Sequence, residues 1–261
     1  MKYCRFETHA GPQYGQVEDR AGTLWIEKLL PAFEEDPWTV TASEAIKPVP
    51  LATVKLLAPV VPRKIVCIGR NYRDHAAELG NDVPKEPLLF LKAPSAVIGP
   101  EDAIQLPSQS QRVDFEGELG IVIGKKAVKI GPDEAVGPYI RGYTVVNDVT
   151  ARDLQKSDGQ WSRAKGFDTF CPVGPLVTDE IDLAAGVAVE TRLNGEVKQQ
   201  GHTRDLIFHI DTLLRYITAA MTLYPGDLIA TGTPAGVAAM QPGDRVEVRV
   251  EGIGALANPV I

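Results

Sequence analysis

The chain has 261 residues, of which 44% are hydrophobic and 23% charged, and this composition is typical of a folded globular protein. Its formal net charge of −7 argues against nucleic-acid binding, because the DNA backbone requires a basic face. The apolar runs are too short to span a bilayer, and the first residues lack the apolar core of a secretory signal. Three widely spaced cysteines exclude a disulfide framework and a thiolate zinc site. We therefore expect a cytoplasmic protein without a membrane or nucleic-acid partner.

The beginning of the chain predicts a small domain of its own. Strand-like runs occur at residues 3–7 and 23–26, and several prolines between residues 48 and 62 then indicate an extended connector. We place a small N-terminal α/β domain at residues 1–55 and a larger domain at residues 60–261.

Short strands separated by glycine and proline dominate the larger domain. The predicted strands are residues 64–68, 88–91, 115–123, 142–149, 187–193, 228–231 and 245–251. Asn194-Gly195 predicts a type I′ hairpin turn, since both central residues of that turn need positive φ. Residues 245–251 alternate valine with charged residues, as in a strand with one wet face. The pattern indicates an α+β fold with a β-rich second domain.

Helices are fewer in this pattern. Residues 205–221 carry apolar side chains at helical spacing. Residues 72–79 predict a short helix, which Asn71 would cap and Gly80 would end. Thr150 and Asp153 predict a capping box that opens another helix.

Acidic side chains gather in residues 113–123 (VDFEGELGIVI). In a strand, side chains alternate between two faces, so Asp114, Glu116 and Glu118 would share one face and the apolar residues the other. Like charges held this close repel one another, and burial makes each one costlier. Either the acidic face lies in water at a sheet edge or a cation neutralises it, and the spacing alone favours neither.

A further carboxylate favours the cation. Asp148 ends an apolar run at residues 143–148 (YTVVND), and a strand end is where a rigid sheet presents functional side chains. Three carboxylates, with water in the remaining positions, suit Mg²⁺ or Mn²⁺ and, less selectively, Ca²⁺. No histidine or cysteine lies near enough in the sequence to suggest zinc.

His75 and Glu78 are candidates for acid–base chemistry. They lie three residues apart on the predicted short helix, hence on one face. A carboxylate beside an imidazole raises its basicity and fixes its orientation, which suits the activation of water. The alternative interpretation is a surface pair without a role.

Four blocks of the chain resemble, in the same order, the signature blocks of the fumarylacetoacetate hydrolase family. They are residues 68–78 (IGRNYRDHAAE), 115–119 (FEGEL), 147–153 (NDVTARD) and 231–234 (TGTP). The resemblance covers about residues 60–261, and it implies a catalytic domain built as a mixed β-sandwich roll and assembled as a homodimer.

The resemblance also implies roles for individual residues. It makes Glu116, Glu118 and Asp148 the ligands of a divalent metal, and His75 with Glu78 the catalytic pair. Residues 80–87 (GNDVPKEP) would form a lid over the bound ligand. Lys165 would stabilise the developing charge of an enolate; without the resemblance, a lysine here reads as a solvated surface group.

Contacts with an anionic substrate are expected from three further stretches. Arg152 and Gln155 follow Asp148, although pairing on the helix surface explains them equally well. The segment 231–233 offers hydroxyls and exposed amides, with a simple turn as the alternative. The expected substrate contacts are Arg152, Gln155, Thr231, Gly232, Thr233, Arg70 and Tyr72.

The resemblance implies a divalent-metal-dependent hydrolase or decarboxylase. It would cleave the C3–C4 bond of small 2,4-dioxo acids or oxaloacetate through a metal-bound pyruvate enolate. One alternative is an isomerase or decarboxylase of 2-hydroxy-diene-dioates from aromatic catabolism, which uses the same enolised intermediate. A second alternative is a non-catalytic Ca²⁺-binding β module.

Overall fold

The computed structural model describes residues 1–31 and 44–261. These residues form mostly strands with few helices, which confirms the predicted fold class. The strands are β1 (Lys2–Thr8), β2 (Gly11–Arg20), β3 (Thr23–Leu30), β4 (Glu44–Pro50), β5 (Leu56–Leu57), β6 (Ile65–Gly69), β7 (Leu88–Lys92), β8 (Val97–Ile98), β9 (Val113–Asp114), β10 (Gly117–Ile123), β11 (Ile140–Asn147), β12 (Thr150–Ala151), β13 (Cys171–Thr178), β14 (Ala188–Leu193), β15 (Glu196–His202), β16 (Leu228–Ala230), β17 (Arg245–Val250) and β18 (Gly254–Pro259). The α-helices are α1 (Arg73–Glu78), α2 (Arg152–Asp158), α3 (Ser162–Gly166) and α4 (Ile210–Ala220).

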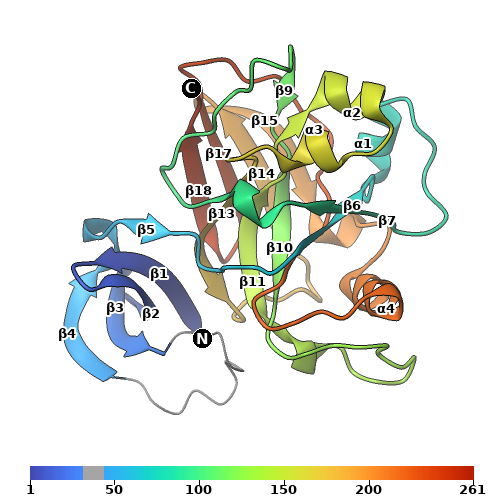
Figure 1. Cartoon of the computed structure of the whole chain (residues 1–261). Coiled ribbons are helices and arrows are strands. Elements are labelled where there is room, and N and C mark those ends of the chain that lie inside the picture. The colour runs from blue at the N-terminus through green and yellow to red at the C-terminus, as the bar shows by residue number, and fades with distance from the viewer. Residues whose placement is uncertain (32–43) are drawn as a thin grey trace.

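The N-terminal strands β1 to β4 form an antiparallel meander at one side of the molecule (Figure 1). Strand β1 also pairs with β13, with Lys2 opposite Thr178 and Tyr3 opposite Val177. The meander therefore extends the main sheet of the larger domain. Residues 32–43 of the predicted N-terminal domain lie outside the described residues, and the domain boundary stays a prediction.

The main sheet runs in the order β4-β3-β2-β1-β13-β11-β10-β16-β6-β7, with β5 paired to β1 and β8 to β13. A second sheet has the order β15-β14-β17-β18, and β9 pairs with β12 apart from both. Leu119 of β10 packs in one hydrophobic cluster with Val189 and Val248 of the second sheet. Ile121 of the same strand packs in another cluster with Leu213 of α4. The opposite face of β10 is covered as well, because Val122 packs in a third cluster with Val177 and Leu228, and the strand is paired on both edges.

Several predicted strand features are confirmed. Asn194 and Gly195 have φ values of 54° and 83°, and they connect the antiparallel strands β14 and β15. In β17 the valines are buried and the charged residues face outward. The three cysteines are free and buried.

The helix predicted at residues 205–221 begins only at Ile210. Leu206 forms an isolated β-bridge with Tyr72, and Ile207 donates its amide to the Asn71 carbonyl oxygen at 2.8 Å. Because these long-range contacts occupy the backbone of Leu206 and Ile207, the helical spacing of their side chains does not produce a helix there.

Two predicted helix caps are wrong. No side chain caps α1, because Asn71 is engaged elsewhere; Gly80, at φ 67°, does follow the end of this helix. Thr150 lies in β12 and donates its hydroxyl to the Asp148 carbonyl oxygen at 2.9 Å. Asp153 accepts hydrogen bonds from Ser110 and from the Gln111 amide instead of completing a capping box.

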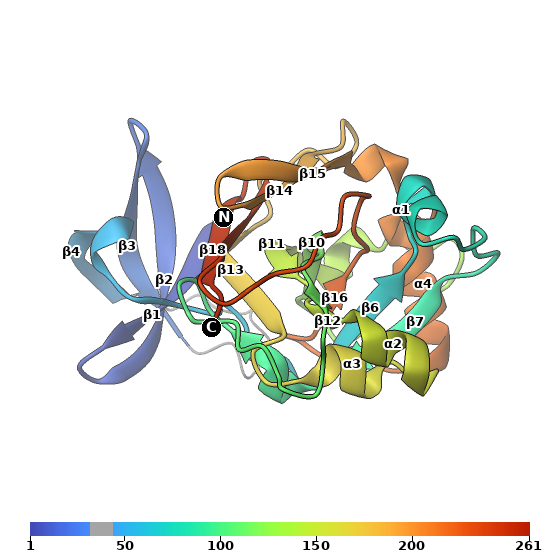
Figure 2. The ribbon, with the colours of Figure 1, turned by 90° about the horizontal axis from the view of Figure 1, so that it is seen from above.

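Helices α1, α2 and α3 gather at the end of the main sheet that lies away from the N-terminal strands (Figure 1). Seen from above, α1 lies on one side of this end and α2 with α3 on the other (Figure 2). Across the described residues, no helix is both long and apolar enough to cross a membrane.

Candidate metal centre and active site

Glu116 and Glu118 lie in the interior of the protein, with exposed fractions of 4% and 2%. Glu118 is the second residue of β10, which pairs with β11 on one edge and β16 on the other. The hypothesis that these acids lie at a solvent-exposed sheet edge is therefore wrong. These carboxylates are buried, and something in the protein or bound to it must balance their charge.

Asp148 completes a carboxylate triad with Glu116 and Glu118. It follows the last residue of β11, and its amide donates to the Glu116 carbonyl oxygen at 2.8 Å. The Glu116 amide in turn donates to Oδ1 of Asn147 at 2.9 Å. One oxygen from each of the three carboxylates lies within 4.8 Å of the other two.

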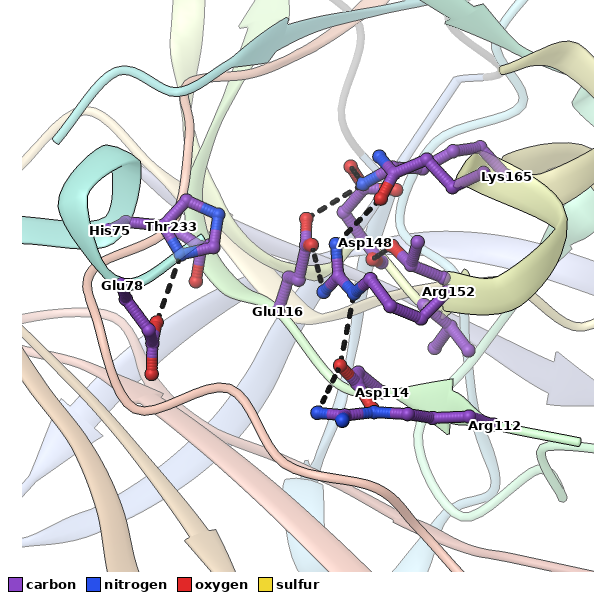
Figure 3. Close-up of polar contacts among 12 residues, drawn as sticks. His75, Glu78, Arg112, Asp114, Glu116, Asp148, Arg152, Lys165 and Thr233 are labelled. Carbon is purple, nitrogen blue, oxygen red and sulfur yellow. Dashed lines mark hydrogen bonds and ion pairs between the residues drawn. The ribbon is translucent and has the colours of Figure 1, made fainter. Parts of the chain in front are cut away.

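Asp114 does not belong to the triad, although alternation along one strand predicted that it would. The strand breaks at residues 115–116, so β9 and β10 are separate elements. Asp114 accepts hydrogen bonds from Nε of Arg112 at 2.9 Å and from Nε of Arg152 at 3.0 Å (Figure 3). Its carboxylate thus neutralises the arginines beside the site.

Lys165 is buried, with 2% of its surface exposed, so the interpretation as a solvated surface group is wrong. Its ammonium group lies 2.7 Å from Oε2 of Glu116 and 2.7 Å from Oδ2 of Asp148 (Figure 3). The other Asp148 oxygen contacts the ammonium of Lys92 at 2.6 Å, and the other Glu116 oxygen contacts Nη2 of Arg152 at 2.7 Å.

The three carboxylates differ in their electrostatic surroundings. Burial works to raise the pKa of Glu116, but the charges of Lys165 and Arg152 outweigh it and lower that pKa. Burial together with the charges of Asp148 and Glu116 raises the pKa of Glu118 well above its ordinary value. Burial works to lower the pKa of Lys165, and the carboxylates of Asp148 and Glu116 raise it overall.

These side chains fit a divalent cation. The triad offers oxygen ligands, which Mg²⁺ and Mn²⁺ prefer. Glu118 contacts no basic side chain among the described residues; its Oε2 accepts a hydrogen bond only from the Gly232 amide, at 2.7 Å. Gly232 has φ 104°, and a Cβ here would lie 2.6 Å from Cβ of Asn71, so glycine is needed to bring this amide to the carboxylate.

His75 and Glu78 lie on α1 as predicted, with His75 buried. Nδ1 of His75 lies 3.3 Å from Oε2 of Glu78, and the Gly236 amide donates to both oxygens of Glu78, at 3.0 and 3.2 Å. The pair lies across from Glu116 and Asp148 (Figure 3). A surface pair without a role does not describe a buried histidine in this position.

A cavity of about 370 Å³ lies between His75 and the carboxylates of Glu116 and Glu118. It is lined by Ile68, Gly69, Arg70, His75, Leu79, Asn81, Glu116, Glu118, Arg152, Gln155, Lys156, Trp161, Lys165 and Thr233. Leu79 directly follows α1. Asn81 belongs to the segment 80–87, which was expected to form a lid and is a loop between α1 and β7.

The expected substrate contacts divide into two groups. Arg70, Arg152, Gln155 and Thr233 line the cavity. Thr231 donates its hydroxyl to the Leu119 carbonyl oxygen at 2.8 Å, and the Gly232 amide donates to Glu118. Neither residue lines the cavity. Tyr72 lines a different cavity.

The sequence reasoning missed three residues that hold the site together. Lys92 contacts Asp148, and Asn147 accepts the Glu116 amide. Gln199 accepts the Gly117 amide and donates to Oγ1 of Thr233 at 2.8 Å. Of these residues, Lys92 could have been identified from the sequence as a candidate, since it directly follows the four apolar residues 88–91 of a predicted strand.

Two family models match the chain. Residues 64–261 match the one described as fumarylacetoacetate (FAA) hydrolase C-terminal, and residues 1–59 match the one described as Rv2993c-like, N-terminal. A human protein named oxaloacetate tautomerase FAHD2A, mitochondrial, is 43% identical over 224 residues, which cover 81% of this chain and 71% of the human protein.

Several solved structures match the whole chain, two isomerases among them. The 5-carboxymethyl-2-hydroxymuconate delta-isomerase from Mycobacterium smegmatis has a TM-score of 0.88 and 40% identity, covering 100% of this chain and 99% of its own. The 2-hydroxyhepta-2,4-diene-1,7-dioate isomerase from Mycobacterium marinum has a TM-score of 0.88 and 42% identity, covering 100% and 98%.

Proposed function

Because the chain belongs to the fumarylacetoacetate hydrolase family, whose members are enzymes, we propose that it acts on small anionic 2-oxo acids by enolisation, with Mg²⁺ or Mn²⁺ in the carboxylate triad. The observation that carries this proposal is the cavity lined by Glu116, Glu118 and His75, in which His75 lies across from Glu116 (Figure 3). On the carboxylate side a bound cation would stabilise negative charge, and on the opposite side His75 would transfer a proton.

The cation would be held by Glu116, Glu118 and Asp148, and when bound it supplies Lewis-acid polarisation of the substrate oxygens. The four carboxylates of this region, which include Asp114, face four basic side chains: Arg112, Arg152, Lys92 and Lys165. A bound divalent cation would therefore leave an excess of positive charge, which suits an anionic substrate.

The side chains of the cavity would share the reaction as follows. His75 holds its Nδ1 toward Glu78, which leaves Nε2 to take a proton from C3 of the substrate and return it. Glu78, held by the Gly236 amide, orients the imidazole ring. Lys165 stabilises the negative charge that develops on the C2 oxygen. Arg152 and Gln155 bind the C1 carboxylate.

Proton transfer without bond cleavage is the reaction we favour, as tautomerisation of oxaloacetate or isomerisation of a 2-hydroxy-diene-dioate. The names of the human relative and of the two solved structures support it. Cleavage of the C3–C4 bond, by hydrolysis of 2,4-dioxo acids or decarboxylation of oxaloacetate, is the second candidate. It is supported by the same pair, because His75 with Glu78 can also activate a water molecule.

A substrate panel tests the proposal and separates its outcomes. The enzyme with Mg²⁺ or Mn²⁺ is given oxaloacetate, acetylpyruvate and 2-hydroxyhepta-2,4-diene-1,7-dioate. Loss of the enol absorbance, pyruvate release and double-bond migration are then followed separately. We expect keto–enol interconversion to be fastest, and we expect His75→Asn to lower kcat by about 10²- to 10⁴-fold. Absence of turnover across the whole panel would refute the proposal.

The control is His9→Asn, which changes an exposed histidine in the turn between β1 and β2 and should leave kcat unchanged. The competing hypothesis, a non-catalytic Ca²⁺-binding module, predicts that metal removal unfolds the chain and that His75→Asn has no effect on any reaction. The homodimer and the cytoplasmic location are further expectations; sedimentation velocity of the 28.2 kDa chain measures the first.

A further inference from the structure

The backbone between two members of the carboxylate triad is held by side chains from distant parts of the chain. Gly117 stands between Glu116 and Glu118. Its amide donates to Oε1 of Gln199 at 3.0 Å, and its carbonyl oxygen accepts the Thr233 hydroxyl at 2.9 Å. Nε2 of Gln199 donates to Oγ1 of Thr233 at 2.8 Å. The three bonds form a closed cycle, which fixes both polar groups of Gly117.

At this end of β10, the cycle takes the place of a neighbouring strand. Strand β16 pairs with β10 only at residues 120–122, so Gly117 lies beyond the end of that ladder. Gln199 is buried and comes from β15, at the edge of the second sheet. A buried backbone amide needs an acceptor, and the Gln199 side chain supplies it. A Cβ at Gly117 would overlap Oγ1 of Thr191 in β14, so glycine is needed for this close approach of the second sheet.

Strand β15 also holds the segment that contacts Glu78. Nε2 of Gln199 donates to the Pro234 carbonyl oxygen at 2.7 Å, and two residues further on the Gly236 amide donates to Glu78. A Cβ at Gly236 would overlap the Lys198 carbonyl oxygen, so this segment lies directly against the backbone of β15. Seen from above, β15 lies on the same side of the molecule as α1, which carries Glu78 (Figure 2). The position of the Gly236 amide therefore depends on β15.

We propose that Gln199 is a positioning residue for both halves of the site. Through Gly117 it fixes the backbone that carries two carboxylates of the triad. Through Pro234 it holds the segment that orients Glu78 beside His75. Gln199 itself does not line the cavity, so it acts through these residues and not on the substrate. The inference rests on the proposed function, since it takes the triad as the metal site and His75 as the group that transfers a proton.

The affinity for Mg²⁺ tests the first half of this proposal. Gln199→Met removes the amide and keeps a side chain of similar length. We expect the Mg²⁺ dissociation constant, measured by isothermal titration of the full-length protein, to rise about tenfold, as on loss of a group that supports a metal ligand. Thr233→Val breaks the same cycle and should raise it about threefold, which also tests the proposal if Gln199→Met does not fold. The double variant should bind little more weakly than Gln199→Met, because residues of one hydrogen-bonded network are not additive.

The protonation pattern of the His75 ring tests the second half. The chain has four histidines, so ¹⁵N NMR resolves the ring nitrogens, and the signals that disappear in His75→Asn belong to His75. With Glu78 held beside Nδ1, the neutral ring should carry its proton on Nδ1. In metal-free protein, at a pH where the ring is neutral, we expect the ratio of the Nδ1–H form to the Nε2–H form to fall about threefold in Gln199→Met, as on weakening of one hydrogen bond.

Asn258→Leu is the matched control. Asn258 is a buried amide of β18, at the opposite edge of the second sheet, and it donates to the carbonyl oxygens of Gly99 and Asp102, both at 2.9 Å. Its loss should destabilise the fold but leave the Mg²⁺ dissociation constant and the ratio of the two ring forms unchanged.

Wild-type values of either quantity in Gln199→Met would overturn the inference, and so would equal changes in Gln199→Met and Asn258→Leu. Neither measurement needs turnover, so the outcome is separate from that of the substrate panel. A protein that shows both effects but converts no substrate of the panel would keep this inference and refute the proposed function. Turnover by the wild-type protein, with both quantities unchanged in Gln199→Met, would do the reverse.

Discussion

Glu118 differs from the other two members of the carboxylate triad because no basic side chain contacts it within the described part of the chain. Glu116 contacts Lys165 and Arg152, and Asp148 contacts Lys92 and Lys165. A buried carboxylate without such a partner destabilises the fold unless it is protonated or binds a cation. Glu118 is therefore the triad member whose surroundings point most directly to a metal.

Substitution of Glu118 separates metal binding from stability. Glu118→Gln keeps an acceptor for the Gly232 amide and removes the unpaired charge. We expect the unfolding temperature without metal to stay the same or rise, and the rise that Mg²⁺ or Mn²⁺ causes in the wild-type protein to disappear. Differential scanning fluorimetry with and without metal measures both effects.

Asp114→Asn is the matched control for this experiment. Asp114 is fully buried and paired with Arg112 and Arg152, so its loss should cost about 3 kcal/mol of stability while the metal-induced rise remains. The opposite pattern, in which Asp114→Asn abolishes the metal effect and Glu118→Gln preserves it, would contradict metal binding by the triad.

The pH dependence follows from the raised pKa of Glu118. Without metal, the Glu118 carboxyl group of the folded chain stays protonated at pH values where that of the unfolded chain is already ionised, because its pKa there has the ordinary value of 4.5. The unfolded state then binds fewer protons, so the free energy of unfolding falls as pH rises from about 4.5 toward the raised pKa. A cation binds the carboxylate only after the proton leaves. The metal-induced rise in unfolding temperature should therefore grow with pH in this window.

Thermal unfolding at several pH values, with and without Mg²⁺, checks this expectation. In Glu118→Gln the dependence should be absent, because the variant carries no proton to release at this position. A metal effect that shrinks as pH rises in the wild-type protein would contradict the assignment of the raised pKa.

At the scale of elements, Asn71 joins three segments that the sequence keeps far apart. Its side-chain amide donates to the carbonyl oxygens of Phe208 at 3.1 Å and Thr231 at 2.8 Å, and its Oδ1 accepts the Phe208 amide at 2.8 Å. The connection sets where α4 begins and where the segment after β16 presents Gly232 to Glu118. This explains why a residue that looked like the cap of α1 serves instead as a tertiary anchor.

Asn71→Ala should therefore destabilise the fold by about 2–4 kcal/mol, because buried polar groups of Phe208 and Thr231 lose their partners. Metal affinity should fall as well, since the Gly232 amide is no longer held against Glu118. Chemical denaturation and metal titration measure the two effects. The matched control is Asn81→Ala, whose amide makes only a local bond to the Leu79 carbonyl oxygen; equal losses in the two variants would contradict the anchor.

At the scale of the whole molecule, the N-terminal strands join the catalytic region through the short seam between β1 and β13. Tyr3, 2% exposed, lies in this seam and packs in the same hydrophobic cluster as Val122 and Val177. The triad and the His75–Glu78 pair all lie within residues 64–261. The seam thus contributes to stability and supplies no residue to the cavity.

Tyr3→Ala should lower the free energy of unfolding by about 3–5 kcal/mol, as expected for removal of a large buried aromatic side chain. The dissociation constant of the metal should stay within a factor of about two. Denaturant titration and metal titration of the same preparation check this expectation. A large loss of metal affinity in a still-folded variant would show that the seam and the site are coupled.

The sequence by itself determined the β-rich fold class, the hairpin at Asn194-Gly195 and a group of acids that contains the triad, although alternation also placed Asp114 in that group. These features depend on local chemistry: alternation along a strand, positive φ at a turn, and the donor types that a cation prefers. The order of the four family blocks added His75, Glu78 and Lys165, and no local pattern reveals that His75 and Lys165 are buried.

Only the tertiary structure decided which acids stand together and what neutralises each one. The break between β9 and β10 turned Asp114 toward the arginines, and pairing across distant strands brought Lys92 to Asp148 and Gln199 to Thr233. The beginning of α4 and the absence of a cap on α1 likewise depend on Asn71. These outcomes depend on contacts between residues dozens of positions apart, which the spacing of residues along the chain does not predict.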